Sequence, residues 1–333
     1  MDGWKGRKVL VTGAEGFIGS HLVERLVAEG AAVRAFVWYN SFARWGWLED
    51  PEVPRDVLSA IEIMPGDIRD PRRVREAVHG RDVVFHLCSL IAIPFSYVAP
   101  DSYVQTNVTG ALNVLNACRD EGTSRLVHTS TSEVYGTARR VPIDESHPLQ
   151  GQSPYSASKI GADMLAESFH RAFGVPVATV RPFNTFGPRQ SARAVIPTIL
   201  AQLHAGATHL RLGSLHPTRD FTFVADTVEA MLRIATCDAA LGRVVNVGSG
   251  REISIGDLVN LILEVTGHAA DVTVEAERVR PAASEVDRLC CDATLAGELA
   301  GWHAGVGLRE GLERTSGWIA ANLRHFKPHE YNR

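Results

Sequence analysis

Cysteine, long apolar runs and excess basic charge are all scarce in this chain of 333 residues. The five cysteines are an odd number and lack the paired spacing of metal ligands, so free thiols in a reducing compartment are expected. No apolar stretch approaches the length of a membrane span, and the N-terminal segment lacks the apolar core of a signal peptide. We therefore expect a cytoplasmic protein that does not contact a membrane.

Charge balance and histidine spacing argue against two further classes of protein. Lys and Arg number 34 against 38 Asp and Glu, a formal net charge of -4, and no run of basic residues occurs. Such a balance argues against a nucleic-acid partner. None of the 13 histidines shows the His-Glu-x-x-His spacing of a metal site, so no metal is expected.

The hydrophobic pattern alternates short β-branched runs with helical periods through the first half of the chain. This alternation predicts βαβ units, hence a parallel sheet with helices on both faces. The second half is punctuated by prolines and is less regular. We predict an α/β fold, with a Rossmann-type doubly wound parallel sheet and a smaller mixed α/β C-terminal substrate lobe. The main elements expected are strands at 8–12, 33–37, 61–64, 83–87, 125–129, 177–181 and 244–247, and helices at 71–78, 101–121, 154–173, 195–205, 255–266 and 308–323.

A glycine-rich turn follows the first expected strand. Gly13, Gly16 and Gly19 have two residues between each pair and lead into an amphipathic helix. The first glycine permits a tight turn, the second lets backbone N–H groups approach a pyrophosphate, and the third lets helix and strand pack closely. The phosphate then lies at the positive end of the helix dipole. In this strand–turn–helix context the spacing predicts a dinucleotide-binding site.

The partner of the adenosine ribose is less evident. The second strand is followed neither by the acidic residue typical of NAD binding nor directly by an arginine suited to NADP. Asn40 or Ser41 could bond a ribose hydroxyl, and Arg44 could reach a phosphate. Asp67, after the third strand, could hold the adenine amine or equally well shape a turn. We expect NAD, with NADP still open.

Tyr155 and Lys159 stand four residues apart, on one face of an expected helix. A free tyrosine titrates near pH ~10 and is a poor base at neutrality. A nearby lysine and a positive nicotinamide ring would favour the phenolate, so Tyr155 could act as a base towards a substrate hydroxyl. The same spacing also arises by chance on many helices.

A hydroxyl cluster with one carboxylate follows the expected strand 125–129. Thr131, Ser132 and Glu133 would lie at the carboxyl end of a parallel strand, where such sheets bind ligands. The alternative is a Ser/Thr-rich turn that caps a helix. The occurrence of this cluster, the Tyr–Lys pair and the glycine turn in one chain favours a catalytic site.

From about residue 7 to residue 325, the chain resembles an extended short-chain dehydrogenase/reductase of the NAD-dependent sugar epimerase/dehydratase group. The matching motifs are the glycine turn, Ser130–Gly136, Tyr155 with Lys159, Arg181–Asn184, and Arg219–Phe221 with Asp226. The resemblance implies a nucleotide-sugar substrate and a homodimer bundled through the helices near 101–121 and 154–173. We expect residues 1–182, with about 220–250, to form the NAD-binding domain. Residues 183–219 and 251–333 would form the nucleotide-sugar-binding lobe.

Several segments are similar to nucleotide-sugar 4,6-dehydratases. Residues 131–133 and 280–287 resemble GDP-mannose 4,6-dehydratases, while 38–48 and 189–193 resemble amino-sugar dehydratases of legionaminic acid-type pathways. The resemblance implies that a UDP- or GDP-N-acetylglucosamine-like substrate is converted to a 4-keto-6-deoxy sugar through transient NADH. Many dehydratases carry Asp at the position of Ser132, which leaves the general acid open. The alternatives are UDP-glucuronate decarboxylation, 4-epimerisation and, more remotely, a non-catalytic NAD sensor.

The resemblance also implies roles for single residues. Tyr155 would remove the proton from the hydroxyl on carbon 4, Thr131 would bond that hydroxyl, and Lys159 would hold the cofactor ribose. Glu133 would be the base at carbon 5, with Ser132 relaying or orienting. The expected cofactor residues are Gly13, Gly16, Phe17, Ile18, Gly19, Asn40, Asp67, Ile68, Leu87, Tyr155 and Lys159, and the expected substrate residues are Asn184, Arg193, Arg219 and Arg280.

Two sets of side chains have alternative explanations. His86 and His128, on expected strands, are predicted to be packed or hydrogen-bonded core residues. Trp38, Trp45 and Trp47 could form a lid over the cofactor or pack against the C-terminal lobe, and the sequence leaves both arrangements open.

Overall fold

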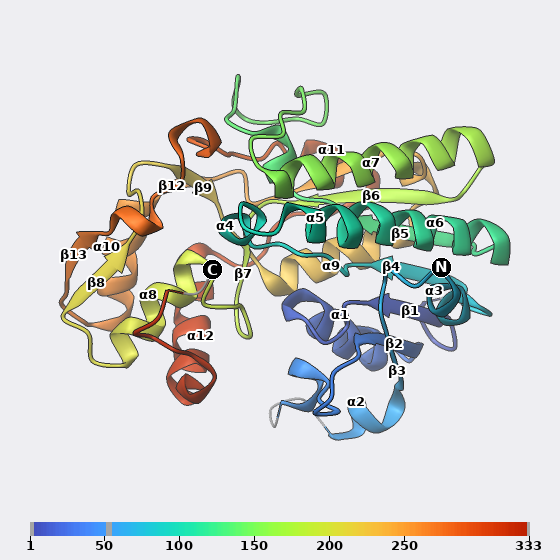
Figure 1. Cartoon of the computed structure of the whole chain (residues 1–333), viewed down its shortest axis with the longest axis horizontal. Coiled ribbons are helices and arrows are strands. Elements are labelled where there is room, and N and C mark those ends of the chain that lie inside the picture. Colours follow the sequence, from blue (N-terminus) through green and yellow to red (C-terminus); the bar gives the residue numbers. More distant parts are fainter. Residues whose placement is uncertain (1–2, 51–54, 332–333) are drawn as a thin grey trace.

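A seven-stranded sheet forms the centre of the computed structural model, which describes residues 3–50 and 55–331 (Figure 1). Every neighbouring pair of its strands is parallel. The strand order reverses between β1 and β4, which makes this the topological switch point of a Rossmann fold. The predicted α/β class and parallel sheet are confirmed. Across the sheet, the strands are β11 (Val244–Val247), β6 (Val177–Pro182), β5 (Arg125–Thr129), β4 (Val83–His86), β1 (Lys8–Thr12), β2 (Ala32–Trp38) and β3 (Glu62–Gly66).

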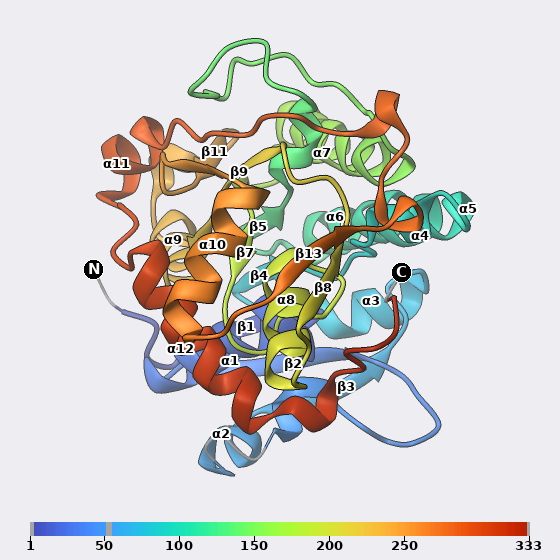
Figure 2. The same cartoon turned by 90° about the vertical axis from the view of Figure 1, so that its left-hand side faces the viewer.

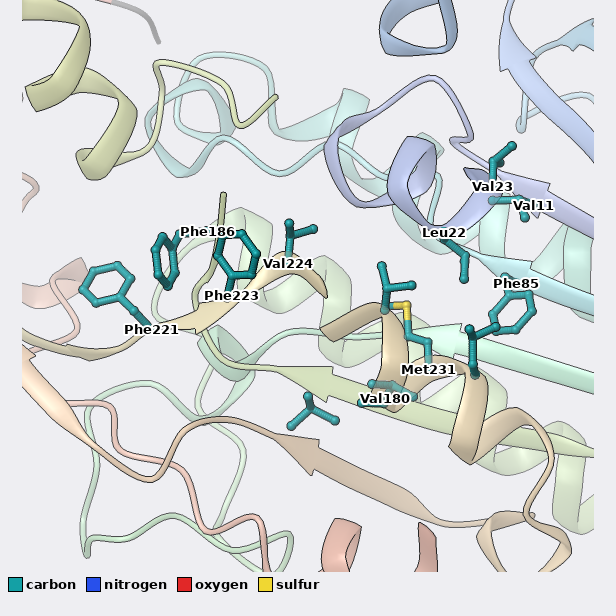
Figure 3. Close-up of a cluster of buried hydrophobic side chains, with 14 of the residues drawn as sticks. Val11, Leu22, Val23, Phe85, Val180, Phe186, Phe221, Phe223, Val224 and Met231 are labelled. Carbon is teal, nitrogen blue, oxygen red and sulfur yellow. The ribbon is translucent and has the colours of Figure 1, made fainter. Parts of the chain in front are cut away.

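Successive side chains of a strand point to opposite faces of the sheet. Because helices cover both faces, each face forms a buried core. Val9 and Val11 of β1 belong to one buried cluster, while Leu10 between them belongs to the other. Figure 3 shows side chains of the first core from β1, α1, β4, β6 and α9. The helices of this face are α1 (Phe17–Ala28) and α9 (Val224–Ala235), with α11 (Thr294–Ala300) beside α9; those of the other face are α3 (Pro71–Val78), α6 (Gly110–Glu121) and α7 (Pro154–Phe173).

Helix α7 has the sequence signals of a well-defined helix. The Ser153 hydroxyl accepts a hydrogen bond from the Ser156 amide, and Pro154 occupies the first turn. Gly174 ends the helix at a φ of 68°, a left-handed conformation that glycine adopts without strain. These signals fix the length of the helix, and the predicted range 154–173 is confirmed.

The sequence predicts one regular helix over 101–121, but the structure has three helical segments there. They are α5 (Pro100–Tyr103), a π-helical segment η2 (Val104–Thr109) and α6. Asn107, in η2, is buried and bonds both backbone groups of Leu90 and the Ser158 hydroxyl of α7. The wider π turn thus places an amide where it ties three segments together, and no periodicity signal marks it.

After β6 the chain adds one more strand to the sheet, β11, packs α9 and α11 against that sheet, and otherwise builds a lobe (Figure 2). Strand β11 pairs with β6, with Val245 opposite Val180, as the sequence predicted. The domain boundaries themselves remain a prediction. The lobe and its connections contain β7 (Thr185–Phe186), α8 (Val195–His204), β8 (His209–Leu212), β9 (Thr218–Asp220), β10 (Thr222–Phe223), β12 (Glu252–Ser254), α10 (Ile255–Thr266), β13 (Asp271–Val274) and α12 (Leu308–Ala321).

Short helices connect these elements. Trp47, in the first of them, packs edge-to-face on Trp318 of α12, with ring centroids 5.3 Å apart, so it packs against the C-terminal part of the chain. Trp38 is 49% exposed, and the Arg69 guanidinium lies over its ring. The short helices are η1 (Gly46–Glu49), α2 (Arg55–Ala60), α4 (Ile93–Ser96), η3 (Ser132–Tyr135), η4 (Asp238–Ala240), η5 (Ala276–Arg278), η6 (Ala282–Ser284) and η7 (Leu323–His325).

Candidate active site

The glycine turn lies tightly against the end of β4 at the switch point. A Cβ on Gly13 would stand 3.0 Å from the Cα of Cys88, and one on Gly19 only 2.1 Å from the Gly13 carbonyl oxygen. The Thr12 hydroxyl fixes this approach by accepting hydrogen bonds from the amides of Leu87 and Cys88, both at 3.2 Å. Among the residues that the structure describes, no side chain caps the N-terminus of α1 at Gly16. These residues fit the pyrophosphate of a dinucleotide.

Other expected cofactor residues are engaged within the protein. The Asn40 carboxamide bonds the backbone of Trp38, Phe42 and Arg44, and so shapes its own loop. The Asp67 carboxylate binds Arg69, whose hydrogen bonds lower the pKa of Asp67. Their roles towards a cofactor remain predictions. Ile68 is buried beneath α6, while Phe17, Ile18 and Leu87 are partly buried against the first core.

Tyr155 and Lys159 both point into the interior at the ends of the strands. The Lys159 ammonium donates a hydrogen bond of 2.7 Å to the Thr129 carbonyl at the end of β5. Burial lowers the pKa of Lys159, and the Asp163 carboxylate opposes that shift. Burial raises the pKa of the Tyr155 phenol, the hydrogen bond with Thr131 lowers it, and the charge of Glu133 raises it. Burial is the largest of these effects, so the pKa of Tyr155 lies above its ordinary value.

The segment after β5 brings the predicted catalytic cluster to the same place. Thr131 caps η3 by accepting a hydrogen bond of 3.3 Å from the Glu133 amide. Ser132 is buried, whereas Glu133 is partly exposed. Thr131 is a hydrogen-bond partner of the Tyr155 phenol, and the charge of Glu133 lies close enough to raise the pKa of that phenol. The helix-capping turn is therefore observed, while the catalytic role of this segment remains a prediction.

Two of the predicted substrate arginines meet on one carboxylate. Arg219 and Arg280 both approach Oε1 of Glu285, at 3.3 and 3.5 Å. Burial lowers the pKa of Arg219, and the charge of Glu133, in the predicted catalytic cluster, raises it. Asn184 donates to the Asp220 carbonyl at 3.3 Å. Arg193 is exposed and bonds the Ser191 hydroxyl, and its role towards a substrate remains a prediction.

A buried polar network that the sequence did not reveal lies beneath this site. The Asp163 carboxylate, on α7, accepts hydrogen bonds from Arg181 at 2.8 Å, from the Ser130 hydroxyl at 2.6 Å, and contacts His128 at 3.1 Å. Burial alone would raise the pKa of Asp163, but the hydrogen bond from His128 and the charge of Arg181 lower it to about 2. Arg181 also donates to the Tyr135 hydroxyl of η3. The network thus ties α7, β5, β6 and η3 together.

The two strand histidines belong to the same interior. His86 and His128 stack with ring centroids 5.8 Å apart, and His86 bonds the Thr12 hydroxyl at 2.9 Å. Burial lowers the pKa of both imidazoles. They are hydrogen-bonded core residues, as predicted. Within 3–50 and 55–331, no cluster of three or more His, Cys, Asp or Glu side chains is arranged to hold a metal, and no helix has the length and apolar character to cross a bilayer.

Comparison with known proteins fits this geometry. A family model described as GDP-mannose 4,6 dehydratase matches residues 10–315. The chain belongs to this family. The predicted resemblance to NAD-dependent sugar epimerases and dehydratases is thereby confirmed, and the GDP-mannose 4,6 dehydratase family comprises nucleotide-sugar enzymes of several reaction types.

Relatives in the GDP-mannose 4,6 dehydratase family differ in the reaction they are named for. A UDP-glucose 4-epimerase of Mycolicibacterium smegmatis is 33% identical over 92% of this chain and 97% of its own. A dTDP-glucose 4,6-dehydratase of Streptomyces antibioticus is 32% identical over 96% of this chain and 94% of its own. A UDP-N-acetyl-alpha-D-glucosaminuronate decarboxylase of Bacillus cytotoxicus is 31% identical over 94% and 98%.

Solved structures agree on the fold. DesIV of Streptomyces venezuelae, a dTDP-glucose 4,6-dehydratase double mutant with NAD and DAU bound, matches with a TM-score of 0.83 and 27% identity, covering 96% of this chain and 99% of that one. A UDP-glucuronic acid 4-epimerase of Bacillus cereus, in complex with UDP-glucuronic acid and NAD, matches with a TM-score of 0.86 and 25% identity, covering 95% and 99%. These NAD-bound neighbours support the sequence prediction of NAD.

Proposed function

We propose that this enzyme is a nucleotide-sugar 4,6-dehydratase that uses NAD and acts on a UDP- or GDP-N-acetylglucosamine-like substrate. The observation that supports this reaction is the place of Glu133 on η3, after the carboxyl end of β5, where its amide bonds Thr131, the hydrogen-bond partner of Tyr155. A 4-epimerase needs the tyrosine and the cofactor but no base at carbon 5. A carboxylate beside the tyrosine therefore favours dehydration.

Tyr155, Thr131 and Lys159 act at carbon 4 of the sugar in the proposed mechanism. The glycine turn and Lys159 would hold NAD, which would supply the hydride acceptor for carbon 4 and the hydride donor for carbon 6. The Tyr155 oxygen takes the proton of the carbon 4 hydroxyl, and Thr131 orients that hydroxyl through its bond to the phenol. Lys159, held by the Thr129 carbonyl, supplies the positive charge that favours the phenolate.

Elimination of water requires one group to act first as base and then as acid. The new ketone acidifies the hydrogen on carbon 5, so the Glu133 carboxylate removes it and then delivers that proton to the departing carbon 6 hydroxyl. Solvent finally supplies a proton to carbon 5 and Tyr155 releases its proton to solvent, so the protons removed equal the protons delivered. Ser132 is buried, which suits an orienting role better than exchange of protons with solvent.

Identification of the reaction needs a product mass for each sugar nucleotide. Incubation with UDP-, GDP-, CDP- and dTDP-sugars is expected to give one product lighter by one water, with no net NADH. Release of CO₂ from a UDP-hexuronate would show decarboxylation instead. An unchanged mass without solvent deuterium at carbon 5 would show simple epimerisation, and either result would overturn the proposal.

Replacing Glu133 by glutamine is expected to cut turnover by about 10²–10⁴-fold, because the amide can neither remove nor deliver the proton at carbons 5 and 6. The rate is measured as formation of the 4-keto product. Glu167→Gln, the same change on the outer side of α7, should leave the rate unchanged. Near-normal turnover of Glu133→Gln would remove this residue from the mechanism.

We also propose that the chain forms a homodimer through α6, α7 and η2. Helices α6 and α7 run side by side on one face of the molecule (Figure 1). Apolar side chains remain exposed there, with Val104 at 49% and Met164 at 44%. Sedimentation at micromolar concentration should show a dimer, and Met164→Glu should convert it to monomer. A wild-type protein that sediments as monomer would contradict this assembly.

A further inference from the structure

A carboxylate from the glycine turn stands at the end of β2. Glu15, between Gly13 and Gly16, accepts a hydrogen bond of 2.8 Å from the Trp38 amide through its Oε1. Trp38 is the last residue of β2. In Rossmann folds this is the place where an acidic residue binds the adenosine ribose of NAD. The chain has no acidic residue in positions 38–41, but Glu15 reaches the same point from the neighbouring turn.

The second carboxylate oxygen of Glu15 lacks a hydrogen-bond partner among the residues that the structure describes. Oε2 is buried and makes no hydrogen bond with any residue in the described part of the chain. An unsatisfied buried carboxylate oxygen is costly, and native structures rarely leave one without a donor. The hydroxyls of a ribose are donors of the kind that this oxygen lacks.

The surrounding loop holds Glu15 in place. The Trp47 amide donates to the Glu15 carbonyl at 3.1 Å. A Cβ on Gly46 would lie 2.6 Å from the same carbonyl, so the loop and the turn are in direct contact. Trp47 of η1 also packs on Trp318 of α12. The loop that contacts the Glu15 backbone is therefore itself held by the C-terminal part of the chain.

The other candidates for this role are already engaged. The amide of Asn40 bonds its own loop, and the carboxylate of Asp67 bonds Arg69. Tyr39 and Phe42 are strongly exposed. Of the polar side chains discussed at this end of the site, Glu15 is the one with a buried oxygen left to bind.

We propose that Glu15 binds the adenosine ribose hydroxyls of the cofactor through Oε2 and thereby selects NAD over NADP. A 2′-phosphate would face this carboxylate, and two negative groups in a partly buried place repel each other. The proposal rests on the dinucleotide site and not on the reaction that follows. Failure of the proposed 4,6-dehydration would therefore leave it unaffected.

The test is the affinity of the enzyme for NADH and NADPH, measured by nicotinamide fluorescence without any sugar substrate. The wild-type enzyme should bind NADH more tightly than NADPH. Glu15→Gln keeps an oxygen for the Trp38 amide but loses the charge, and a hydrogen bond to a charged group is worth about a 10–100-fold change in affinity. We expect NADH affinity to fall by about that factor, while NADPH affinity stays the same or rises.

A matched control is available in the same loop. Glu49 accepts a hydrogen bond of 2.9 Å from the Trp45 amide, so Glu49→Gln removes a comparable charge without reaching the cofactor. Both affinities should then remain unchanged. Glu15→Ser is the second variant and should lose the preference for NADH as well. An equal loss of both affinities in the Glu15 variants, or tighter binding of NADPH by the wild type through Arg44, would overturn the proposal.

Discussion

Replacing Tyr155 by phenylalanine is expected to lower kcat by about 10²–10⁴-fold while NADH still binds. The variant loses the oxygen that accepts the proton of the carbon 4 hydroxyl, but its ring still fills the buried space beside Tyr103, where the two ring centroids are 6.2 Å apart. Product formation at saturating sugar nucleotide measures the first effect, and nicotinamide fluorescence measures the second. Tyr103→Phe is the control, since its hydroxyl donates to the Ala92 carbonyl and not to the site.

The pH dependence of the wild-type enzyme follows from the same phenol. Burial raises the pKa of Tyr155, and the deprotonated phenol is the form that accepts the proton. The rate at low substrate should therefore rise with pH through the neutral and alkaline range. A Tyr155→Phe variant that keeps near-normal turnover, or a wild-type rate that falls over this range, would contradict the assignment.

The second large effect is expected in stability. Replacing Arg181 by methionine should lower the free energy of unfolding by about 3–5 kcal/mol, because it leaves the buried Asp163 carboxylate without its cationic partner. Urea denaturation measures the change. The double variant Arg181→Met, Asp163→Leu removes both charges and should recover much of the loss. Arg72→Met removes an exposed partner of Glu76 and should cost no more than about 1 kcal/mol.

Asp163 determines the direction in which the free energy of unfolding changes as the pH falls. Its pKa in the folded protein is about 2, below its ordinary value of 3.8, so its ionised form stabilises the native state. That contribution is complete above the ordinary pKa and is lost as the pH falls towards about 2. Wild-type stability should therefore decline more steeply than that of Asp163→Asn below about pH 4. Parallel declines would show that the carboxylate is not held by this network.

Most strands and helices, and the residues with local spacing signals, could be predicted from the sequence. The glycine turn and the Tyr155–Lys159 pair are each defined by residues only a few positions apart. Their spacing can therefore be recognised from the sequence alone. Asp163 lies on the same helix but reads as an ordinary polar residue. Its burial depends on contacts with β5 and β6, which are distant in sequence. The hydrophobic periodicity of the helix does not predict those contacts.

Glu15 illustrates the same limit at the cofactor site. It occupies a variable position between two glycines, and the sequence places the expected ribose partner about 20 residues later. The structure brings the end of β2 to Glu15, which explains why a strand end without an acid is compatible with NAD. The π turn around Asn107 has no sequence signal for a related reason, since the apolar spacing of its segment is also compatible with a regular period of 3.6.

The return of β11 to the sheet has a consequence for biosynthesis. Strand β6 is buried along all six of its residues, yet its outer neighbour is synthesised more than 60 residues later. At about 5–20 residues per second, the ribosome needs several seconds to deliver that neighbour. During this interval a nascent chain that has already formed the earlier strands carries an open, apolar strand edge, which is a template for pairing with other chains. Ribosome-associated chaperones are therefore expected to contact this enzyme between the synthesis of β6 and that of β11.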